Sequence, residues 1–227
     1  MSDIISSSTR TFGRRQGRPI KETKQQLLDE LFPTISIELP EVDHVINPNI
    51  YFDQQAPIWF EVGFGGGEHI AQLAVQHPDI NFIGCEPFMN GVASLVNHIH
   101  EHDIKNIRMF QGNALDLLKS FNNECLARFY LMFADPWPKK RHHKRRFIQP
   151  KILDWVIPKL ELNAEFRLAT DHETYQEWMV KHLRARTDLN EVLYTFDKPA
   201  DWPNTRYEAK AIEEGRKPLY LVFKRST

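Results

Sequence analysis

Residues 57–76, PIWFEVGFGGGEHIAQLAVQ, join a short apolar run to a glycine cluster and then to an amphipathic segment. The apolar run predicts a buried strand, and Ile70, Leu73 and Ala74 have the spacing of one helix face. Glycines at positions 63, 65 and 67 let the backbone turn tightly and approach a ligand. A buried strand, a glycine turn and a helix are the first unit of a parallel α/β sheet.

The same alternation continues along the chain. Further strands are predicted at residues 80–86, 106–112, 128–135 and 164–171, with helices at 68–77, 91–99, 115–118, 147–160 and 173–183. Residues 189–196 and 219–225 add two closing strands. We therefore expect an α/β fold with a doubly wound, mostly parallel, seven-stranded sheet, and one domain over residues 31–227.

The bulk composition is that of an ordinary globular protein, with 227 residues, 41% hydrophobic and 26% charged. Because the net charge is −1, any site for a polyanion must be a local patch. Two distant cysteines, Cys85 and Cys125, fit a reducing compartment without disulfides or zinc. We expect a cytoplasmic protein with no membrane span and no metal. Residues 1–30 form a basic arm that we expect to be flexible, either a solubilising tail or a nucleic-acid arm.

Ligands of such sheets bind outside the carboxyl ends of the strands, so the corners after each strand are informative. The glycine cluster lacks the Gly-Lys-Ser/Thr of a P-loop. A dinucleotide fingerprint starting at Gly63 would need glycine at position 68, where Glu68 stands. A carboxylate at a helix N-terminus disfavours a pyrophosphate there. The cluster fits a nucleoside without phosphates, or else a purely structural tight turn.

The next two corners carry one polar residue each. Glu86 follows the second strand, 23 residues after Gly63, where an acid can accept both ribose hydroxyls. Asn113 follows the third strand, where its amide can read an adenine edge or cap the next helix. Together these corners indicate an adenosine-type ligand without phosphates, and in this fold that is S-adenosylmethionine. The alternative for Glu86 is a solvated strand end.

The fourth corner is FADPWPKKRHHKRR, residues 133–146. Asp135 ends the predicted fourth strand, and Pro136 and Pro138 stiffen the segment that carries Trp137. Six lysines and arginines then follow within eight residues, within reach of a phosphate backbone. Such a run can also be a solvated face, but here it adjoins the predicted cofactor pocket.

These motifs, with LATDHETY (168–175) and NTRYEAKAIEEGRKPLYLVFKR (204–225), resemble those of bacterial tRNA (guanine-N7-)-methyltransferases of the TrmB type. The resemblance spans residues 57–225. It implies a class I S-adenosylmethionine-dependent methyltransferase that acts on guanine N7 in the variable loop of tRNA, at tRNA position 46. Asn113 departs from the family, in which many members have aspartate.

The resemblance also implies roles for particular residues. The cofactor pocket is expected to comprise Glu61, Gly63, Gly65, Glu86, Asn113 and Asp135. Contacts to guanine or tRNA are expected from Lys139, Asp171, Thr205, Arg206, Tyr207 and Glu208. The RNA-contacting segment is expected to comprise Arg141, His142, His143, Lys144, Arg145 and Arg146.

Methyl transfer to guanine N7 requires no proton removal, because N7 carries a free lone pair. The absence of a nucleophile elbow, a zinc motif or an acid/base pair fits that chemistry. We expect Asp135 to be the catalytic residue, favouring the cationic guanine that forms.

Four of these residues have structural alternatives. Thr170-x-x-Glu173 matches a capping box, which would put Asp171 in the first helical turn as a purely structural residue. We expect both roles together, with the cap fixing the backbone while Asp171 accepts from the N1–H and N2–H₂ edge of guanine. Glu208 contacts guanine or is a surface charge. Trp137 and Tyr207 stack on a base or pack against the protein.

Three rival functions are also compatible with parts of the sequence. The first is a non-catalytic tRNA-binding protein with the same fold, which intact Glu86 and the glycines disfavour. The second is an exocyclic-amine methyltransferase, whose polar-Pro-Pro-aromatic corner is interrupted here by Trp137. The third is a dehydrogenase, which Glu68 disfavours. A monomer and a homodimer both agree with the sequence.

Overall fold

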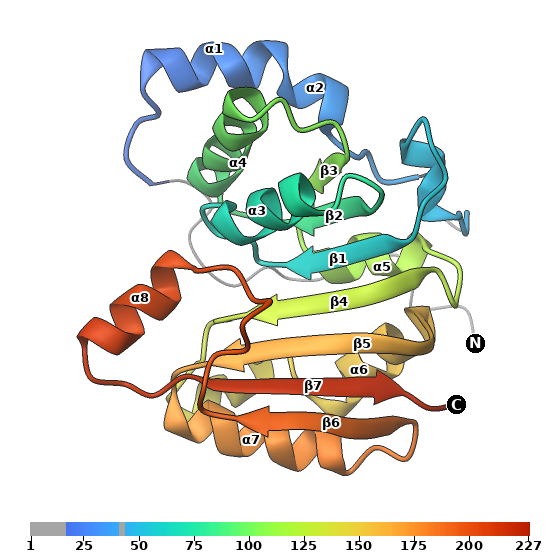
Figure 1. Ribbon diagram of the computed structural model, residues 1–227, viewed down its shortest axis with the longest axis vertical. Coiled ribbons are helices and arrows are strands. Elements are labelled where there is room, and N and C mark those ends of the chain that lie inside the picture. The colour runs from blue at the N-terminus through green and yellow to red at the C-terminus, as the bar shows by residue number, and fades with distance from the viewer. Residues whose placement is uncertain (1–16, 41–43) are drawn as a thin grey trace.

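The computed structural model describes residues 17–40 and 44–227. Within these residues seven strands form one sheet in the order β3-β2-β1-β4-β5-β7-β6 (Figure 1). The strands are β1 (Ile58–Val62), β2 (Asn81–Cys85), β3 (Ile107–Phe110), β4 (Leu126–Met132), β5 (Leu160–Thr170), β6 (Leu189–Thr195) and β7 (Leu219–Arg225). Strands β1 to β5 pair in parallel, and β7 runs antiparallel to both β5 and β6. The predicted mostly parallel α/β sheet is confirmed.

Helices cover both faces of this sheet, because side chains along each strand point alternately to opposite sides. Phe60 of β1 packs in one core with α5 (Ala114–Ser120), α6 (Pro150–Val156) and α7 (Glu173–Arg184). Its neighbour Trp59 packs in the other core with α3 (Glu68–Gln76) and α4 (Met89–Glu101). Short 3-10 turns η1 (Pro48–Tyr51), η2 (Lys140–Arg145) and η3 (Ile157–Lys159) complete the connections. The doubly wound prediction is confirmed.

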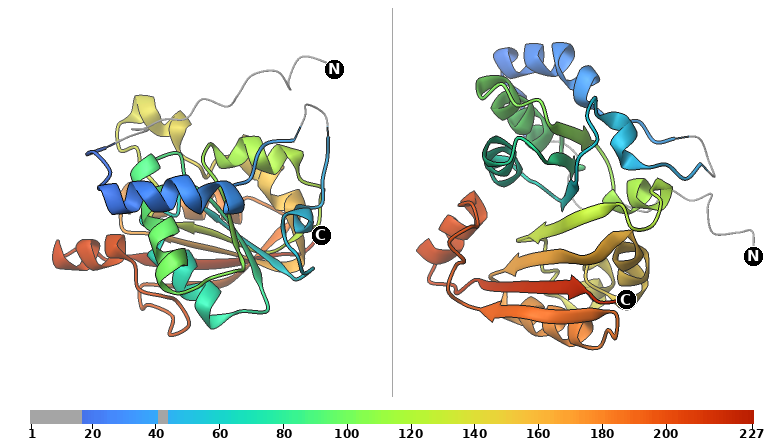
Figure 2. Two further views of the ribbon diagram at one scale, coloured as in Figure 1. Left: turned by 90° about the horizontal axis from the view of Figure 1, so that it is seen from above. Right: turned by 45° about the vertical axis from the view of Figure 1, so that its right-hand side comes forward.

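Residues 17–35 form a folded segment that contacts α4. Gly17 donates its backbone N–H to Asn90 Oδ1 at 2.8 Å, and Asn90 donates to the carbonyl of Arg18. Helices α1 (Glu22–Glu30) and α2 (Phe32–Ile35) follow, and α1 lies beside α4 (Figure 2). Leu28 of α1 is buried in the core that contains α4. The expectation of a flexible arm is therefore wrong for residues 17–30. Residues 1–16 of that arm lie outside the described residues.

The sheet order places a crevice at the carboxyl ends of β1 and β4. The chain builds β1, β2 and β3 outward on one side and then returns to add β4 and β5 on the other. The loops that follow β1 and β4 therefore diverge and leave room for a ligand. Helix α8 (Arg206–Glu213) lies beyond the arrowheads of these strands, on the left in Figure 1. Across the described ranges, no helix combines the length and apolar character needed to span a bilayer.

Candidate functional site

A cleft of about 1270 Å³ lies at this edge of the sheet. It is built from the corners that follow β1, β2, β3 and β4, and α8 closes one side. The predicted site residues that line it are Gly63, Gly65, Glu86, Asn113, Asp135, Lys144, Arg145, Arg206 and Tyr207. The fold thus brings the expected cofactor corners, Asp135 and part of the basic run into a single cavity.

The glycine turn after β1 has a backbone that side chains disfavour. Gly63 and Gly65 adopt left-handed conformations, with φ of 68° and 56°. The ring of Tyr207 from α8 also lies against Gly65, with Cε2 only 3.0 Å from where a Cβ would stand. Both the turn and the close approach of α8 therefore require glycine here.

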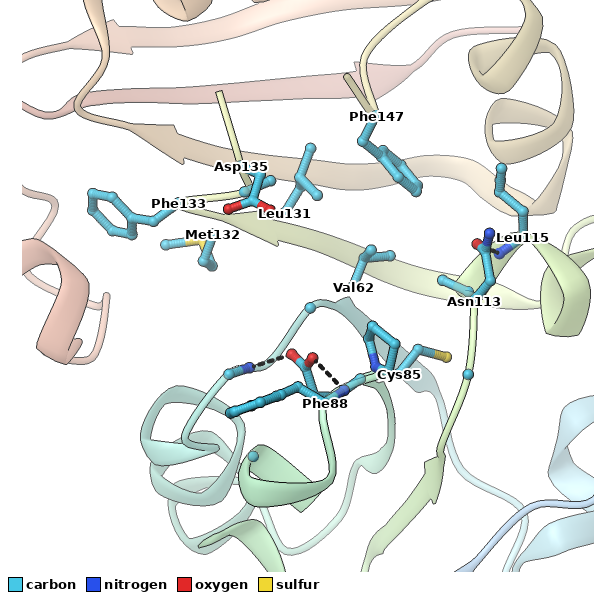
Figure 3. A pocket seen from close by; sticks show the side chains of 18 of the residues that line it. Val62, Cys85, Phe88, Asn113, Leu115, Leu131, Met132, Phe133, Asp135 and Phe147 are labelled. Atoms are coloured by element: carbon cyan, nitrogen blue, oxygen red, sulfur yellow. Dashed lines mark hydrogen bonds between the residues drawn. The ribbon is translucent and has the colours of Figure 1, made fainter. Parts of the chain in front are cut away.

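Glu86 stands directly after β2 with its carboxylate held by backbone donors. Oε2 accepts from the N–H of Gly65, and Oε1 accepts from the N–H of Phe88, each at 2.9 Å (Figure 3). Burial raises the pKa of this carboxyl above that of an ordinary glutamate, and the two backbone N–H donors partly oppose the rise. Each carboxylate oxygen can accept more than one hydrogen bond, so both can still receive a ligand hydroxyl.

Asn113 begins α5 and lines the cleft at the same time. Its Oδ1 accepts from the backbone N–H of Leu115 at 3.0 Å, so the helix-capping interpretation is confirmed. In Figure 3 the apolar Val62 lies between Asn113 and Asp135, and Cys85 and Phe147 line the cavity on either side of it. This gives the cavity an apolar wall beside a polar corner.

Glu61 lies beneath the main cleft and not in its wall. The side chain is buried, and Oε2 is 2.7 Å from Nδ1 of His69 on α3. Glu61 instead borders a small adjoining pocket with Phe64, His69 and Tyr207. The contact with His69 joins β1 to the first turn of α3, next to the glycine turn.

Asp135 lies three residues beyond the end of β4, which stops at Met132 and not at Asp135 as expected. The residues two positions before and after it, Phe133 and Trp137, have positive φ of 51° and 42°, a backbone conformation that residues with side chains rarely adopt. The carboxylate faces the cleft, across from the corner that carries Phe88 (Figure 3). Desolvation by the surrounding walls raises the pKa of Asp135.

Most of the basic run, on η2 and the residue before it, lies outside the cleft. Lys139, Arg141 and Lys144 are exposed, and of these three Lys144 also lines the cleft. His142 lies among them, and its pKa is lowered by partial desolvation and then by the neighbouring cations. The guanidinium of Arg145 lies over the ring of Trp137, 4.9 Å from its centroid.

The aromatic residues beside this run make protein contacts. The ring of His143 packs edge-on against Trp178 of α7, with centroids 5.2 Å apart. Trp137 likewise lies 5.9 Å from the ring of His142. Trp137 also lines the cleft, so base stacking by this ring stays a prediction.

Arg146, the last residue of the run, is placed differently from the prediction. It is only 1% exposed, and its guanidinium donates to the carbonyls of Pro136 and Thr174 and to the Thr174 hydroxyl. A side chain enclosed in this way does not reach a phosphate on the surface. The expected RNA contact of Arg146 is therefore wrong.

The segment after β5 also departs from the sequence interpretation. Helix α7 begins at Glu173 with His172 as its N-cap, so Thr170-x-x-Glu173 does not form a capping box. Thr170 is instead the last residue of β5. Asp171 stands between the two elements and forms an ion pair with Arg216, which follows α8. Asp171 is not among the residues that line the cleft.

Of the four residues at 205–208 that we expected to contact guanine or tRNA, two line the main cleft and two make contacts within the protein. Thr205 caps the helix by accepting from the N–H of Glu208 at 3.0 Å. The carboxylate of Glu208 is buried and accepts from Lys198 and from the hydroxyl of Tyr220, so its interpretation as a surface charge is wrong. The pattern Thr-x-x-Glu at 205–208 is the signal that predicts this helix start. Arg206 and Tyr207 alone of this group face the main cleft.

Sequence reasoning missed several residues of the cleft wall, namely Lys24, Lys119, Phe147, Lys151 and Trp155. Lys151 and Trp155 are one turn apart on α6, a spacing that the sequence offers, but no pattern tells which face of α6 meets the cleft. Among the described residues, His98, Glu101 and His102 at the end of α4 have spacing suited to a metal ion. They do not line the cleft.

The open, doubly wound sheet, with β7 antiparallel between β5 and β6, has the architecture of the class I methyltransferases. Solved structures of this class have the same architecture. The 16S rRNA methyltransferase KamB superposes with a TM-score of 0.61 at 13% identity, covering 84% of this chain and 99% of that chain. An antibiotic-related methyltransferase gives a TM-score of 0.54 at 18% identity, covering 77% of this chain and 88% of that chain. At these identities the likeness establishes the fold.

Sequence comparison identifies the family. Residues 55–221 match the family described as "Putative methyltransferase". The tRNA (guanine-N(7)-)-methyltransferase of Paramagnetospirillum magneticum is 42% identical, covering 95% of this chain and 92% of that protein. The enzyme of the same name from Zymomonas mobilis is 40% identical, with coverages of 95% and 94%. The chain belongs to the tRNA (guanine-N(7)-)-methyltransferase family.

Proposed function

We propose that this chain transfers a methyl group from S-adenosylmethionine to N7 of a guanine in the variable loop of tRNA, at tRNA position 46. The observation that carries the proposal is the position of Asp135. Its carboxylate faces the cavity that contains the nucleoside corners, and the exposed cations of η2 follow it directly. Family membership supports the same reaction.

The cleft fits the cofactor by its donor and acceptor groups. Glu86 is oriented by the backbone of Gly65 and Phe88, and its remaining lone pairs suit the two ribose hydroxyls. Gly63 and Gly65 present backbone without side chains, which allows close approach of a ligand. Glu68 at the start of α3 disfavours a ligand with phosphates. We assign ribose binding to Glu86 and adenine binding to the Asn113 corner.

Glu61 supports this pocket from below. Because its carboxylate is bound to His69, we assign it to holding the glycine turn against α3. This refines the role that the family resemblance implies for Glu61, which was direct contact with the cofactor.

When bound, S-adenosylmethionine supplies an electrophilic methyl group on a positively charged sulfur. Because guanine N7 carries a lone pair, it would accept this methyl group without losing a proton. The chain's task is therefore to orient guanine and to stabilise the positive charge that develops on it. Asp135 is the carboxylate at the correct edge of the cleft for that role.

The RNA surface that we propose begins at η2 and continues to α8. Lys139, Arg141 and Lys144 are exposed, and Arg206 and Tyr207 line the cleft from the other side. An overall charge of −1 makes this local concentration of cations the part of the described surface best suited to a polyanion.

The test is incubation of the full chain with an unmodified tRNA transcript and methyl-labelled S-adenosylmethionine, followed by borohydride–aniline cleavage at N7-methylguanine. The expected result is label transfer and one cut at the variable-loop guanine. Label without cleavage would identify an exocyclic-amine methyltransferase. Retention of tRNA on a filter without label transfer would identify a non-catalytic binding protein.

A further inference from the structure

Arg146 is the innermost cation of the basic run and is held by three hydrogen bonds. Nε donates to the carbonyl of Pro136 at 2.7 Å. Nη1 and Nη2 donate to the carbonyl and the hydroxyl of Thr174, at 3.3 and 3.0 Å. One side chain thus joins the residue after Asp135 to the first turn of α7.

Burial of this guanidinium is costly unless its contacts compensate. It lies 4.9 Å from the ring centroid of Trp178 and 5.2 Å from that of Tyr175, both on α7. Among the described residues, the ion pairs found within 4.0 Å do not include Arg146. A buried cation satisfied by carbonyls, a hydroxyl and aromatic faces is a rigid connection, because guanidinium is planar and its donors have fixed directions.

The backbone that Arg146 holds is under strain. Phe133 and Trp137, on either side of the Ala134–Pro136 segment, both have positive φ, which side-chain-bearing residues rarely adopt. The carbonyl of Pro136 belongs to the peptide group that enters Trp137, so the bond from Arg146 fixes the orientation of that peptide. Strained backbone persists at functional sites only where its surroundings hold it.

We propose that Arg146 is a positioning residue: it holds the Asp135–Pro136–Trp137 segment against α7, so that the Asp135 carboxylate faces the methyl-accepting guanine. This inference rests on the proposed function and on the assignment of Asp135 to catalysis. It divides the basic run into exposed cations that bind RNA and a buried cation that sets the geometry of the reaction.

The experiment compares Arg146→Lys with Arg141→Ala. Lysine keeps the charge but loses the planar set of donors, so kcat is expected to fall between about 10- and 100-fold from misplacement of Asp135. The affinity for tRNA and its dependence on salt should stay close to those of the wild type. Arg141→Ala should do the reverse, weakening tRNA binding and lowering the salt slope by about 1.

Two milder variants at Thr174 test the same connection in case Arg146→Lys does not fold. Thr174 is exposed, and its hydroxyl contacts Arg146 Nη2 and, at 3.2 Å, Nδ1 of His172; Thr174→Val removes both contacts with little change in volume. We expect kcat to fall about two- to fivefold in Thr174→Val, as for loss of the hydrogen bond to Arg146. Thr174→Ser keeps the hydroxyl and should restore the wild-type kcat. Lys181→Ala, on the exposed surface of the same helix, is the neutral control.

Two results would overturn the inference. If Arg146→Lys weakens tRNA binding and reduces the salt slope with kcat unchanged, Arg146 is an RNA contact. If Arg146→Lys and Thr174→Val both keep the wild-type kcat in a folded protein, the connection does not position Asp135. Failure of the wild type itself to methylate tRNA would instead refute the proposed function.

Discussion

The two halves of the cleft differ in how they are held. The cofactor half, formed by the corners after β1, β2 and β3, is fixed mainly by backbone groups of the same corners. Glu86 accepts from Gly65 and Phe88, and Asn113 caps its own helix. The acceptor half, formed by the corner after β4 with α8, is fixed by side chains from distant segments, some of them on the corner after β5, which lies outside the cleft wall. Asp171 meets Arg216, 45 residues away.

This difference indicates two kinds of constraint. A cofactor of fixed shape can be held by short corner motifs with backbone donors. A base that must be brought in on a large RNA needs a surface assembled from several elements, in which each long-range contact can be altered separately. Variants in the cofactor half should therefore affect cofactor affinity, and variants in the acceptor half should affect turnover or tRNA affinity.

The largest effect is expected at Asp135. Asp135→Asn keeps the shape and removes the charge, so kcat should fall on the order of 10²- to 10³-fold, as when one group that stabilises transition-state charge is removed. Single-turnover methylation with saturating cofactor and tRNA measures it. Calorimetric binding of S-adenosylhomocysteine should be nearly unchanged. Near-normal turnover would remove Asp135 from the mechanism and break the proposed division of the cleft.

The matching change in the cofactor half is Glu86→Gln. Loss of charged hydrogen bonds to the ribose should weaken cofactor binding by about 10- to 100-fold. Isothermal calorimetry measures this directly, and turnover should recover at saturating cofactor. The control is Glu101→Gln, because Glu101 is the last residue of α4 and does not line the cleft. A loss of kcat that excess cofactor does not restore would contradict the assignment.

The pH dependence of the reaction should also distinguish the cofactor half of the cleft from the acceptor half. Burial raises the pKa of both Glu86 and Asp135, so each carboxyl becomes protonated at a higher pH than an ordinary acid. Both are needed as carboxylates, so activity should fall as pH falls through these raised values, approaching about tenfold per pH unit for each group. Rate profiles at low and at saturating cofactor separate them. The dependence of kcat should disappear in Asp135→Asn, and its persistence there would assign it to another group.

Smaller effects are expected from the exposed cations of η2. Arg141→Ala and Lys144→Ala should each weaken tRNA binding about three- to tenfold, since each removes one cation from the proposed RNA surface. Filter binding over a range of salt concentrations measures the change in slope. Lys181→Ala should leave the slope unaltered. An unchanged slope in both η2 variants would mean that the RNA lies elsewhere.

The smallest change in stability is expected at the Asp171–Arg216 ion pair. Because Arg216 is exposed, Arg216→Ala should alter the free energy of unfolding by less than about 1 kcal/mol. Asp171→Asn should change the free energy of unfolding, measured by chemical denaturation, equally little. If the carboxylate accepts hydrogen bonds from the guanine edge, the same variant should raise the KM for tRNA about fivefold. A large loss of stability with unchanged KM would make Asp171 a purely structural residue.

The cofactor half could be predicted from the sequence more fully than the acceptor half, for a physical reason. Strand ends, glycine turns and helix caps are local patterns, so the sequence alone places Glu86 and Asn113 at adjacent corners. The burial of Arg146 depends on Thr174, Tyr175 and Trp178, which reach it only through the packing of α7. A run of six cations offers no local sign that its last member turns inward. Glu208 is a similar case, because its two donors, Lys198 and Tyr220, come from other elements.

The antiparallel direction of β7 has a practical consequence for handling the protein. Because β7 runs opposite to β5, the chain leaves the sheet at the edge away from the cleft (Figure 1). A label attached after residue 227 would leave the proposed RNA surface open to solution.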